Sequence, residues 1–274
     1  MASKDNTRIA FIGGGNMASA IIGGLIRQGV PAAEIAVVEP FAEARARLAA
    51  QFGLQAQAQA GPHLASAGLV VWAIKPQTFK EAAALARPHV QQALHLSVAA
   101  GIRSDSIAQW LGSERIARSM PNTPALVGKG MTALYARPAV DAGERERVER
   151  VIATTGEFLW VDHEPQLDAV TALSGSGPAY VFYFLEAMVQ AGAELGLPPQ
   201  QARRLAEATF AGASALARAS DDPLELLRER VTSKGGTTYA ALTSMEQDGV
   251  KEKFVQAMHA ACRRADELGN EFGR

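Results

Sequence analysis

Residues 8–18 read Arg8-Ile9-Ala10-Phe11-Ile12-Gly13-Gly14-Gly15-Asn16-Met17-Ala18, an apolar run followed by three glycines and the start of a helical pattern. From Gly13 onward they fit the form G-x-G-x-x-A. Gly13 allows a tight turn, Gly15 lets a pyrophosphate approach the backbone, and Ala18 lets helix and strand pack closely. Phosphate oxygens then meet the N–H groups at the helix start. The pattern predicts a dinucleotide site; the alternative is an ordinary glycine turn.

The first half of the chain alternates β-like runs with helical patterns, which is typical of parallel strands joined by right-handed helical crossovers. Residues 69–74 are almost continuously apolar, as expected of a strand buried on both faces. We therefore predict an α/β fold with a mostly parallel sheet. The predicted strands are 8–12, 35–39, 69–74, 93–99 and 116–120, with helices at 17–28 and 42–51.

Glu39 ends the second predicted strand, roughly 20 residues after the glycines, where an acidic side chain can bind both hydroxyls of the adenine ribose. A carboxylate at this place repels a 2′-phosphate. An inward-pointing Glu39 therefore favours NADH over NADPH. The alternative is a solvated glutamate at a strand end, and the nearby Arg45 and Arg47 complicate the preference.

Small or polar turns follow the later predicted strands, at the edge where doubly wound sheets bind their ligands. The small residues let a flat ring approach, and Asn122 offers both a donor and an acceptor. Lys75 is expected to cap a loop rather than to act in catalysis. These turns are predicted to line the nicotinamide side of the site. They are residues 73–76 (Ala-Ile-Lys-Pro), 98–101 (Val-Ala-Ala-Gly) and 120–124 (Met-Pro-Asn-Thr-Pro).

Beyond about Val161 the β-like runs stop and helical patterns dominate. The change indicates a second, all-helical domain. We place the boundary near residues 162–167 and predict domains at 1–163 and 164–274. The predicted helices are 178–195, 199–219, 223–231, 238–247 and 250–268.

One predicted helix contains Tyr180-Val181-Phe182-Tyr183-Phe184-Leu185, which is apolar on all its faces. Such a helix is buried on every side, and a domain of about 110 residues has little interior to bury it. We therefore expect a partner subunit to cover it in an obligate homodimer. The alternative is a monomer in which the first domain covers it.

A second anion-binding pattern, Ser233-Lys234-Gly235-Gly236-Thr237-Thr238, runs directly into a helix-like segment. Consecutive glycines can turn successive N–H groups into one space. The helix start adds unpaired donors and a partial positive charge. We predict a seat for a small carboxylate, with a hydroxyl left for a neighbouring atom. A chain with both this seat and a dinucleotide site is expected to be an oxidoreductase.

The bulk composition argues against several classes of protein. A length of 274 residues, 48% of them apolar, suits two folded domains. A net charge of -1 without a dense basic stripe gives no support for nucleic-acid binding. No apolar run approaches the roughly 20 residues that cross a membrane, and residues 1–8 lack a signal-peptide pattern. Cys262 is the only cysteine, so we expect a reducing, cytoplasmic setting.

Neither a metal site nor a hydrolase is predicted. None of the five histidines has the spacing of metal ligands. His163, beside Glu164 near the predicted domain junction, is the one histidine worth following. Residues 174–177 (Ser-Gly-Ser-Gly) resemble a nucleophile elbow only loosely, because no clear strand precedes them. We expect this loop to pack beneath the cofactor or the substrate.

Together, and in their order along the chain, these motifs resemble those of the pyrroline-5-carboxylate reductase family. The first motif is shared by many dehydrogenases, whereas the last two are specific. The similarity spans nearly the whole chain. The matching stretches are residues 11–18, 73–76, 99–101, 120–124, 168–180 and 231–238.

The resemblance implies reduction of 1-pyrroline-5-carboxylate to L-proline by NADPH or NADH, the last step of proline biosynthesis. It implies a Rossmann-like first domain and an all-helical dimerisation domain, with dimers often gathered into decamers. It also implies that Thr238 hydrogen bonds the substrate in catalysis. The cofactor residues are then Ile12, Gly13, Gly14, Gly15, Asn16, Met17, Glu39, Ala73, Ile74, Lys75, Pro76, Val98, Ala99, Ala100 and Asn122, and the substrate residues are Glu164, Ser233, Gly235, Gly236, Thr237 and Thr238.

Two positions depart from the family pattern. Lys234 stands where the family commonly has proline, so the loop loses a fixed φ angle and gains a cation near the proposed carboxylate. Ala60 lies where relatives often carry an asparagine near the adenine ribose. Cofactor contacts on that side are therefore left open.

Other functions stay open at this point. One is reduction of a related cyclic imine, and another is 3-hydroxyacid reduction, which usually needs a lysine or histidine acid–base group at the domain junction. A third is a nucleotide-sensing protein without turnover. The predicted carboxylate seat argues against a sensor, which has no need of one.

Overall fold

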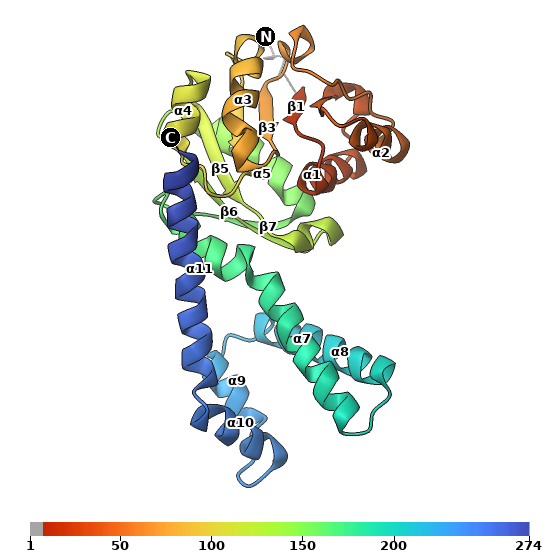
Figure 1. Cartoon of the computed structure of the whole chain (residues 1–274), viewed down its shortest axis with the longest axis vertical. Helices are drawn as coiled ribbons and strands as arrows, with labels where there is room; N and C mark the ends of the chain where they lie inside the picture. The colour runs from red at the N-terminus through yellow and green to blue at the C-terminus, as the bar shows by residue number, and fades with distance from the viewer. Residues whose placement is uncertain (1–7, 274) are drawn as a thin grey trace. The chain divides into compact units, whose positions relative to one another are not determined.

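The computed structural model describes residues 8–273 and divides the chain into two compact units (Figure 1). The described part of the first unit runs to Ser176 and resumes at Ala261, and the second unit is Gly177–Ala260. The predicted boundary at 163/164 thus lies within the first unit, because residues 164–176 belong to it. Separate roles for residues 1–163 and 164–274 stay a prediction.

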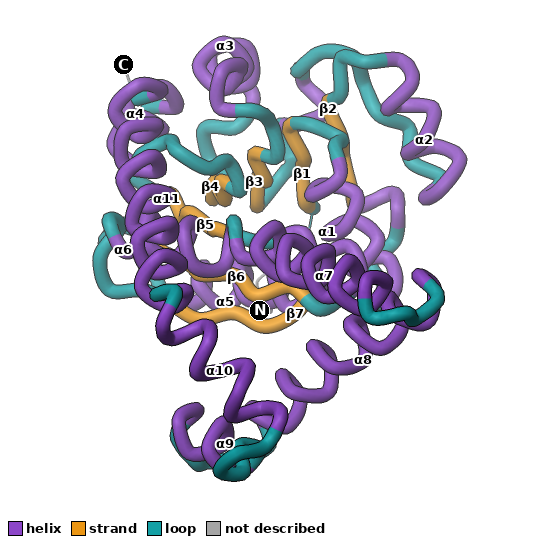
Figure 2. Tube along the Cα trace, turned by 60° about the horizontal axis from the view of Figure 1, so that its bottom comes forward, coloured by secondary structure: helices purple, strands orange, loops and turns teal. Residues whose placement is uncertain are grey.

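A seven-stranded sheet in the order β2-β1-β3-β4-β5-β6-β7 forms the centre of the first unit (Figure 2). β1 to β5 pair in parallel, β6 is antiparallel to β5, and β7 is parallel to β6. The predicted α/β fold with a mostly parallel sheet is confirmed. The strands are β1 (Ile9–Ile12), β2 (Ile35–Val38), β3 (Leu69–Trp72), β4 (Leu94–Ser97), β5 (Ile116–Met120), β6 (Gly130–Ala136) and β7 (Gly156–Trp160).

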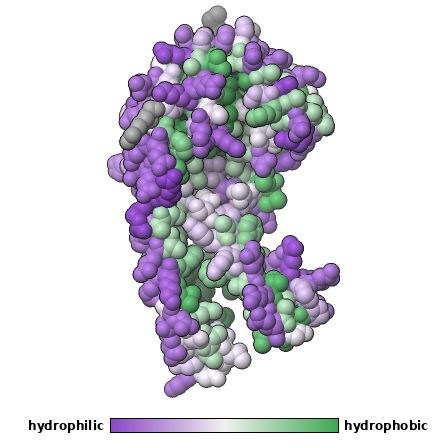
Figure 3. Space-filling view, viewed as in Figure 1, coloured by the Kyte–Doolittle hydropathy of each residue, from purple (hydrophilic) through white to green (hydrophobic). Residues whose placement is uncertain are grey.

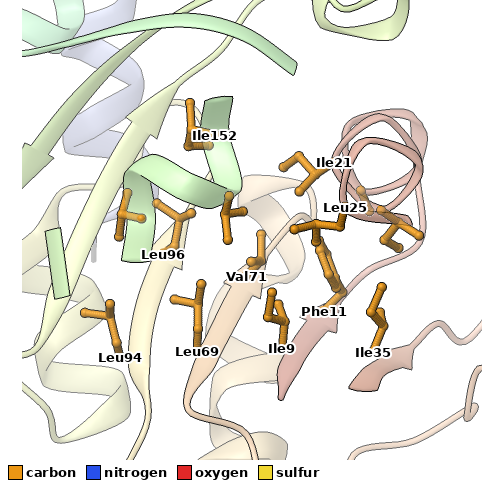
Figure 4. Close-up of a cluster of buried hydrophobic side chains, with 14 of the residues drawn as sticks. Ile9, Phe11, Ile21, Leu25, Ile35, Leu69, Val71, Leu94, Leu96 and Ile152 are labelled. Atoms are coloured by element: carbon orange, nitrogen blue, oxygen red, sulfur yellow. The ribbon is translucent and has the colours of Figure 1, made fainter. Parts of the chain in front are cut away.

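Helices cover both faces of the sheet, as the alternation of side chains along β1 shows. Phe11 packs in one core cluster with residues of α1 and α5 (Figure 4). Ala10 and Ile12 point the other way, into a second cluster with residues of α3 and α4. Such two-sided burial explains the continuous apolar runs of these strands. The helices of this unit are α1 (Asn16–Arg27), α2 (Ala42–Phe52), α3 (Pro76–Ala86), α4 (Ser104–Leu111), α5 (Ala142–Ile152) and α6 (Gln166–Val170).

The second unit is built from helices alone, as predicted. α7 and α8 lie side by side and are joined by a turn in which Gly196 has a φ of 94° and the N–H of Leu197 donates to the carbonyl of Gly192 (2.9 Å). Phe254 packs edge-on against Tyr180 and Phe184, with 5.6 Å between ring centroids in each pair. The helices are α7 (Gly177–Glu194), α8 (Pro199–Arg218), α9 (Leu224–Arg230), α10 (Thr237–Gln247) and α11 (Val250–Phe272).

Large apolar side chains remain on the surface of this helical unit (Figure 3). On α7, Val181 is 40% exposed, Phe182 57% and Tyr183 70%. Their burial, which the sequence predicts, is therefore not achieved within the helical unit itself. Exposed apolar surface of this extent is typical of a protein–protein contact.

The end of α11 returns to the first unit. The guanidinium of Arg103 donates a hydrogen bond to Asp266, and the hydroxyl of Ser106 donates to the carbonyl of Gly273 (2.9 Å). A Cβ atom at Gly101, where φ is 70°, would lie 3.0 Å from the Cβ of Leu268. The second unit is thus an insertion that leaves the first unit after Ser176 and rejoins it at Ala261.

His95 lies in the middle of β4 and is 1% exposed. Its Nδ1 accepts a hydrogen bond from Nε1 of Trp72 at 3.3 Å, which fixes the neutral ring. Burial, and to a lesser extent repulsion by Arg115, lowers the pKa of His95 to about 4. The unfolded chain binds a proton here near the ordinary pKa of about 6.5, whereas the folded chain binds it only near pH 4.

We therefore predict that His95 contributes stability above its unfolded pKa and that this contribution is lost as the pH falls from about 6.5 to about 4, to a total of roughly 3 kcal/mol. The measurement is the free energy of urea unfolding at several pH values for the native chain and for His95→Gln. The variant should lose less stability than the native chain over this range. Parallel curves for the two proteins would contradict the assignment.

Candidate active site

The carboxyl ends of β1 and β3 flank the point where the strand order of the sheet reverses. The chain runs from β1 to β2 on one side and then crosses to β3 on the other. The N–H of Gly13 donates to the carbonyl of Val38, and the N–H of Ala73 donates to that of Ile12, both at 2.8 Å. Ligands of open α/β sheets bind in the crevice at such a switch point.

The three glycines, Gly13, Gly14 and Gly15, differ in what surrounds them. Gly13 has a φ of 98°, and a Cβ atom there would lie 2.4 Å from the carbonyl oxygen of Ala73. A Cβ at Gly14 would lie 2.6 Å from Cδ1 of Leu48, whereas nothing lies within 4 Å of one at Gly15. Gly13 and Gly14 are therefore needed for packing. Gly15 leaves open space at the start of α1.

This open space fits the pyrophosphate of a dinucleotide. Gly15 is the N-cap of α1 and makes no side-chain cap hydrogen bond. The first N–H groups of a helix have no intrahelical acceptor, and they attract anions. A phosphate can occupy the place that a side chain at residue 15 would otherwise fill. The first unit thus offers the cradle that NADH or NADPH requires.

The structure brings most of the predicted cofactor residues to one edge of the sheet. They follow the carboxyl ends of four neighbouring strands, β2, β1, β3 and β4. Lys75, at the N-cap of α3, is exposed and makes no side-chain cap bond, so its place suits a loop residue rather than a buried catalyst. The residues at this edge are Ile12–Met17, Glu39, Ala73–Pro76 and Val98–Ala100.

Asn122 is also at this end of the sheet, after β5, but its side chain is already engaged. Its Oδ1 accepts from the N–H of Met131 at 2.9 Å, and its Nδ2 donates to the hydroxyl of Ser174 at 3.2 Å. Ser174 lies in a π-helical turn, Thr171–Gly175, between α6 and α7. These contacts give Asn122 a structural role, and its contact with the cofactor stays a prediction.

Glu164 is likewise engaged within the first unit. One carboxylate oxygen accepts from the N–H of Ser104 (2.5 Å) and from the guanidinium of Arg118 (2.6 Å), and the other accepts from the hydroxyl of Ser104 (2.6 Å). The carboxylate thus caps α4 and neutralises a buried arginine. These contacts give Glu164 a structural role, and its contact with the substrate stays a prediction.

Sequence reasoning missed Arg118, which is 5% exposed in the centre of β5. Its Nε is buried without a hydrogen-bond partner in the described chain. The sequence feature that could have indicated it is an arginine within the strand Ile116–Met120. A charge buried in a strand needs a partner, so such an arginine predicts an ion pair. Asp168 lies nearby, and its pKa is raised by burial, against the opposing effects of Arg103 and Arg118.

The glycine–threonine loop lies in the second unit and differs in one respect from the prediction. Gly235 has a φ of 74°, as a tight turn requires, but the N–H of Gly236 donates to the carbonyl of Ser233 at 2.9 Å. That N–H closes the turn and is not available to an anion. The available donors come instead from the first turn of α10, at Thr237, Thr238 and the next residue, because Gly236 provides no side-chain cap.

Thr237 and Thr238 are exposed at this helix start, and so are Ser233 and Lys234. The helix start, its hydroxyls and the lysine all favour an anion. Among residues 8–273 no group of three or more acidic, histidine or cysteine side chains could hold a metal ion. In the same described range, no helix is both long and apolar enough to span a membrane.

A separate cavity of about 330 Å³ lies at the opposite ends of the strands in the first unit. Ile9 and Leu69, which begin β1 and β3, contribute to its wall, together with Arg8 and Arg150. None of the predicted cofactor residues lines it. It is therefore distinct from the crevice beside Gly13.

Comparison with known proteins matches both halves of the chain to families. Residues 164–268 match the model described as pyrroline-5-carboxylate reductase dimerisation. Residues 8–101 match the model described as NADP oxidoreductase, coenzyme F420-dependent. The first match starts within the first compact unit and includes the whole second unit.

Similar proteins cover nearly the full length of the chain. Pyrroline-5-carboxylate reductase of Pseudomonas aeruginosa is 44% identical over 270 residues, with coverage of 97% of this chain and 98% of the relative. The solved reductase of Coxiella burnetii has a TM-score of 0.89 and 36% identity, covering 96% and 99% of the two chains. The NADP-bound reductase of Plasmodium falciparum has a TM-score of 0.87 and 26% identity, covering 97% and 100%.

These similarities extend across both compact units and confirm the resemblance seen in the motifs. The chain belongs to the pyrroline-5-carboxylate reductase family.

Proposed function

We propose that this chain reduces 1-pyrroline-5-carboxylate to L-proline with NADPH or NADH, as the last step of proline synthesis, in the cytoplasm. The observation that carries the proposal is the uncapped start of α10, with Thr238 in its first turn, in a chain that also has the glycine cradle of α1. The two helix starts supply one seat for a carboxylate and one for a pyrophosphate.

In this proposal the start of α10 binds the substrate carboxylate, and the hydroxyl of Thr238 hydrogen bonds the ring nitrogen and orients the imine. Gly15 and the first turn of α1 hold the pyrophosphate. The small residues Ala73 and Ala99 leave room for the nicotinamide. When bound, NAD(P)H supplies the hydride. The protein's part is to hold the imine carbon within near-attack reach, since hydride transfer requires little more than position once the imine is protonated.

We propose further that the helical unit forms a homodimer through α7, and that decamers are built from such dimers. The match of residues 164–268 to a dimerisation family supports a homo-oligomer. The exposed Phe182 and Tyr183 supply apolar surface for the contact. A partner's copy of the same face would bury them.

The alternative functions gain no support from the site. A hydroxyacid dehydrogenase would need a histidine or lysine acid–base group. His163 is exposed, and its backbone N–H donates to the side chain of Gln166 (2.8 Å) in the turn before α6. This exposed position in a turn does not suit a residue that transfers protons to a bound substrate.

The direct test is a steady-state assay of the purified protein with 1-pyrroline-5-carboxylate and either NADH or NADPH. Proline should form in step with oxidation of the cofactor. A parallel assay with 3-hydroxy acids and NAD should show no turnover. Cofactor binding without oxidation by any cyclic imine would overturn the proposal in favour of a sensor.

Loss of the Thr238 hydroxyl should slow the reaction without unfolding the protein. We expect Thr238→Ala to lower kcat by ~10–100-fold, equivalent to roughly 1.4–2.7 kcal/mol of transition-state stabilisation. Thr238→Ser keeps the hydroxyl and should retain most of the activity. Unchanged turnover in Thr238→Ala would remove this residue from the mechanism.

A methyl group at residue 15 should block the cofactor while leaving the fold intact. Gly15 has a φ of -73°, which alanine can adopt, and open space for a Cβ atom. Gly15→Ala should therefore change the unfolding free energy by less than ~1 kcal/mol and raise the Kd of the cofactor by about tenfold or more, since about 1.4 kcal/mol is tenfold.

The matched control for this substitution is Gly143→Ala, near the start of α5, where a Cβ atom meets only an ordinary contact with Asp141. Its cofactor affinity, measured by fluorescence titration, should equal that of the native chain. Equal affinities for Gly15→Ala and the native chain would place the pyrophosphate elsewhere.

A charge on the exposed face of α7 should break the oligomer. Phe182→Glu places a carboxylate where we propose that two copies meet, and an unpaired buried charge is costly. Light scattering after size-exclusion chromatography should then show a smaller species than for the native chain. Gln201→Glu, at an exposed site at the start of α8, is the control and should leave the mass unchanged; an unchanged mass for Phe182→Glu would move the contact to another face.

A further inference from the structure

Glu39 is the most deeply buried acidic group at the cofactor edge. It directly follows β2, is 6% exposed, and its N–H donates to the carbonyl of Gln57 at 2.8 Å. The backbone on both sides of the side chain is therefore fixed. Burial and this backbone contact place the carboxylate inside the edge of the sheet.

The carboxylate is aimed at the glycine cradle. Oε2 accepts from the N–H of Gly14 at 2.8 Å, and Oε1 accepts from the N–H of Phe41 at 2.9 Å. The glycine loop and the glutamate are in direct contact, because a Cβ atom added at Gly14 would lie only 3.3 Å from Oε2. A carboxylate oxygen can accept about two hydrogen bonds. Each oxygen therefore keeps one lone pair for a hydroxyl donor.

The nearest cation is not arranged to hold a phosphate. Nη1 of Arg45 donates to the carbonyl oxygens of Glu39 (2.9 Å) and Pro40 (2.7 Å). Bidentate binding of phosphate uses parallel N–H groups of the guanidinium, and one nitrogen of this fork is occupied by the turn after β2. Arg47, two residues further along α2, is exposed.

We propose that Glu39 makes this chain selective for NADH over NADPH. The carboxylate accepts hydrogen bonds from the two hydroxyls of the adenine ribose while it keeps its bonds to Gly14 and Phe41. A 2′-phosphate would remove one hydroxyl donor and place up to two negative charges beside a buried carboxylate. The arginine that could offset this charge is held on backbone carbonyls.

The inference rests on the cofactor site proposed above, but not on the identity of the imine substrate. Glu39 acts directly on the cofactor in this view. Its hydrogen bond to Gly14 also gives it a structural role in the glycine loop. An experiment has to separate this structural role from the effect on cofactor preference.

The test is the ratio of the Kd of NADPH to that of NADH, measured by fluorescence titration of the full chain without substrate. A ratio of at least ~10 is expected for the native chain. Glu39→Gln removes the charge and should lower the ratio by about tenfold, chiefly through tighter binding of NADPH. A purely structural role would weaken both cofactors by the same factor and leave the ratio unchanged.

Two further variants keep the test decisive. Glu39→Asp retains the charge and should retain the preference for NADH, even if the shorter side chain weakens both cofactors. Glu39→Ser, a smaller uncharged residue, replaces Glu39→Gln if thermal unfolding shows that the amide disrupts the cradle. Glu43→Gln, which removes an exposed charge from the first turn of α2, is the matched control and should change the ratio by less than ~2-fold.

The outcomes separate this inference from the proposed function. A native chain that prefers NADPH, or an unchanged ratio in the uncharged variants, overturns the role of Glu39 even if proline is formed. If the Kd ratios are as predicted but 1-pyrroline-5-carboxylate is not reduced, the role of Glu39 is supported and the proposed reductase function is overturned. Failure of the native chain to bind either cofactor overturns both.

Discussion

The close approach of two turns, after β1 and after β3, is the constraint on which the first unit depends. A side chain at residue 13 would meet the carbonyl oxygen of Ala73 at 2.4 Å, and this oxygen belongs to a backbone that cannot move alone. The strands beside it are held in register, with Ile12 opposite Trp72. Only glycine lets the chain turn here and enter α1 directly. The position of the helix start, and with it the anion seat, follows from this contact.

Four helix starts in this protein show two contrasting arrangements. α4 and α5 begin with carboxylates on their first N–H groups, from Glu164 and from Asp141 respectively. α1 and α10 begin after Gly15 and Gly236, which have no side chain to offer. Capped starts stabilise the fold, whereas starts left open after glycine keep their donors for a ligand. The same backbone property thus serves stability in one place and binding in another.

The sequence predicted the first five strands, the helical second half and the glycine cradle, because each depends on local periodicity or on a turn. It did not predict β6 and β7. β6 begins at Gly130, and β7 is an edge strand of five residues whose side chains alternate between half-buried and exposed. A half-exposed edge strand such as β7 is hard to distinguish from a loop, whereas β6, with seven mostly buried residues, was overlooked for no reason of length. The capping box of Asp141 and Glu144, by contrast, was a local signal for α5 that went unused.

The candidate site was less predictable where a side chain's partner is distant in the chain. Asn122 and Glu164 are polar residues of matching motifs, and a motif does not say whether such a residue faces a ligand or the protein. Asn122 reaches Ser174, and Glu164 reaches Arg118 and Ser104. Tertiary contacts of this range follow from the fold and not from the local pattern.

These same contacts fix the backbone between β5 and α7. The π-helical turn Thr171–Gly175 is the last segment of the first unit before α7 begins. π-helical turns are costly in general and are kept where they serve a site. Here Asn122 binds Ser174, and a Cβ atom at Gly175 would lie 2.3 Å from Cε of Met120. The turn is thus fixed to the end of β5, so the sheet that carries the cofactor residues also holds the point from which the helical unit departs.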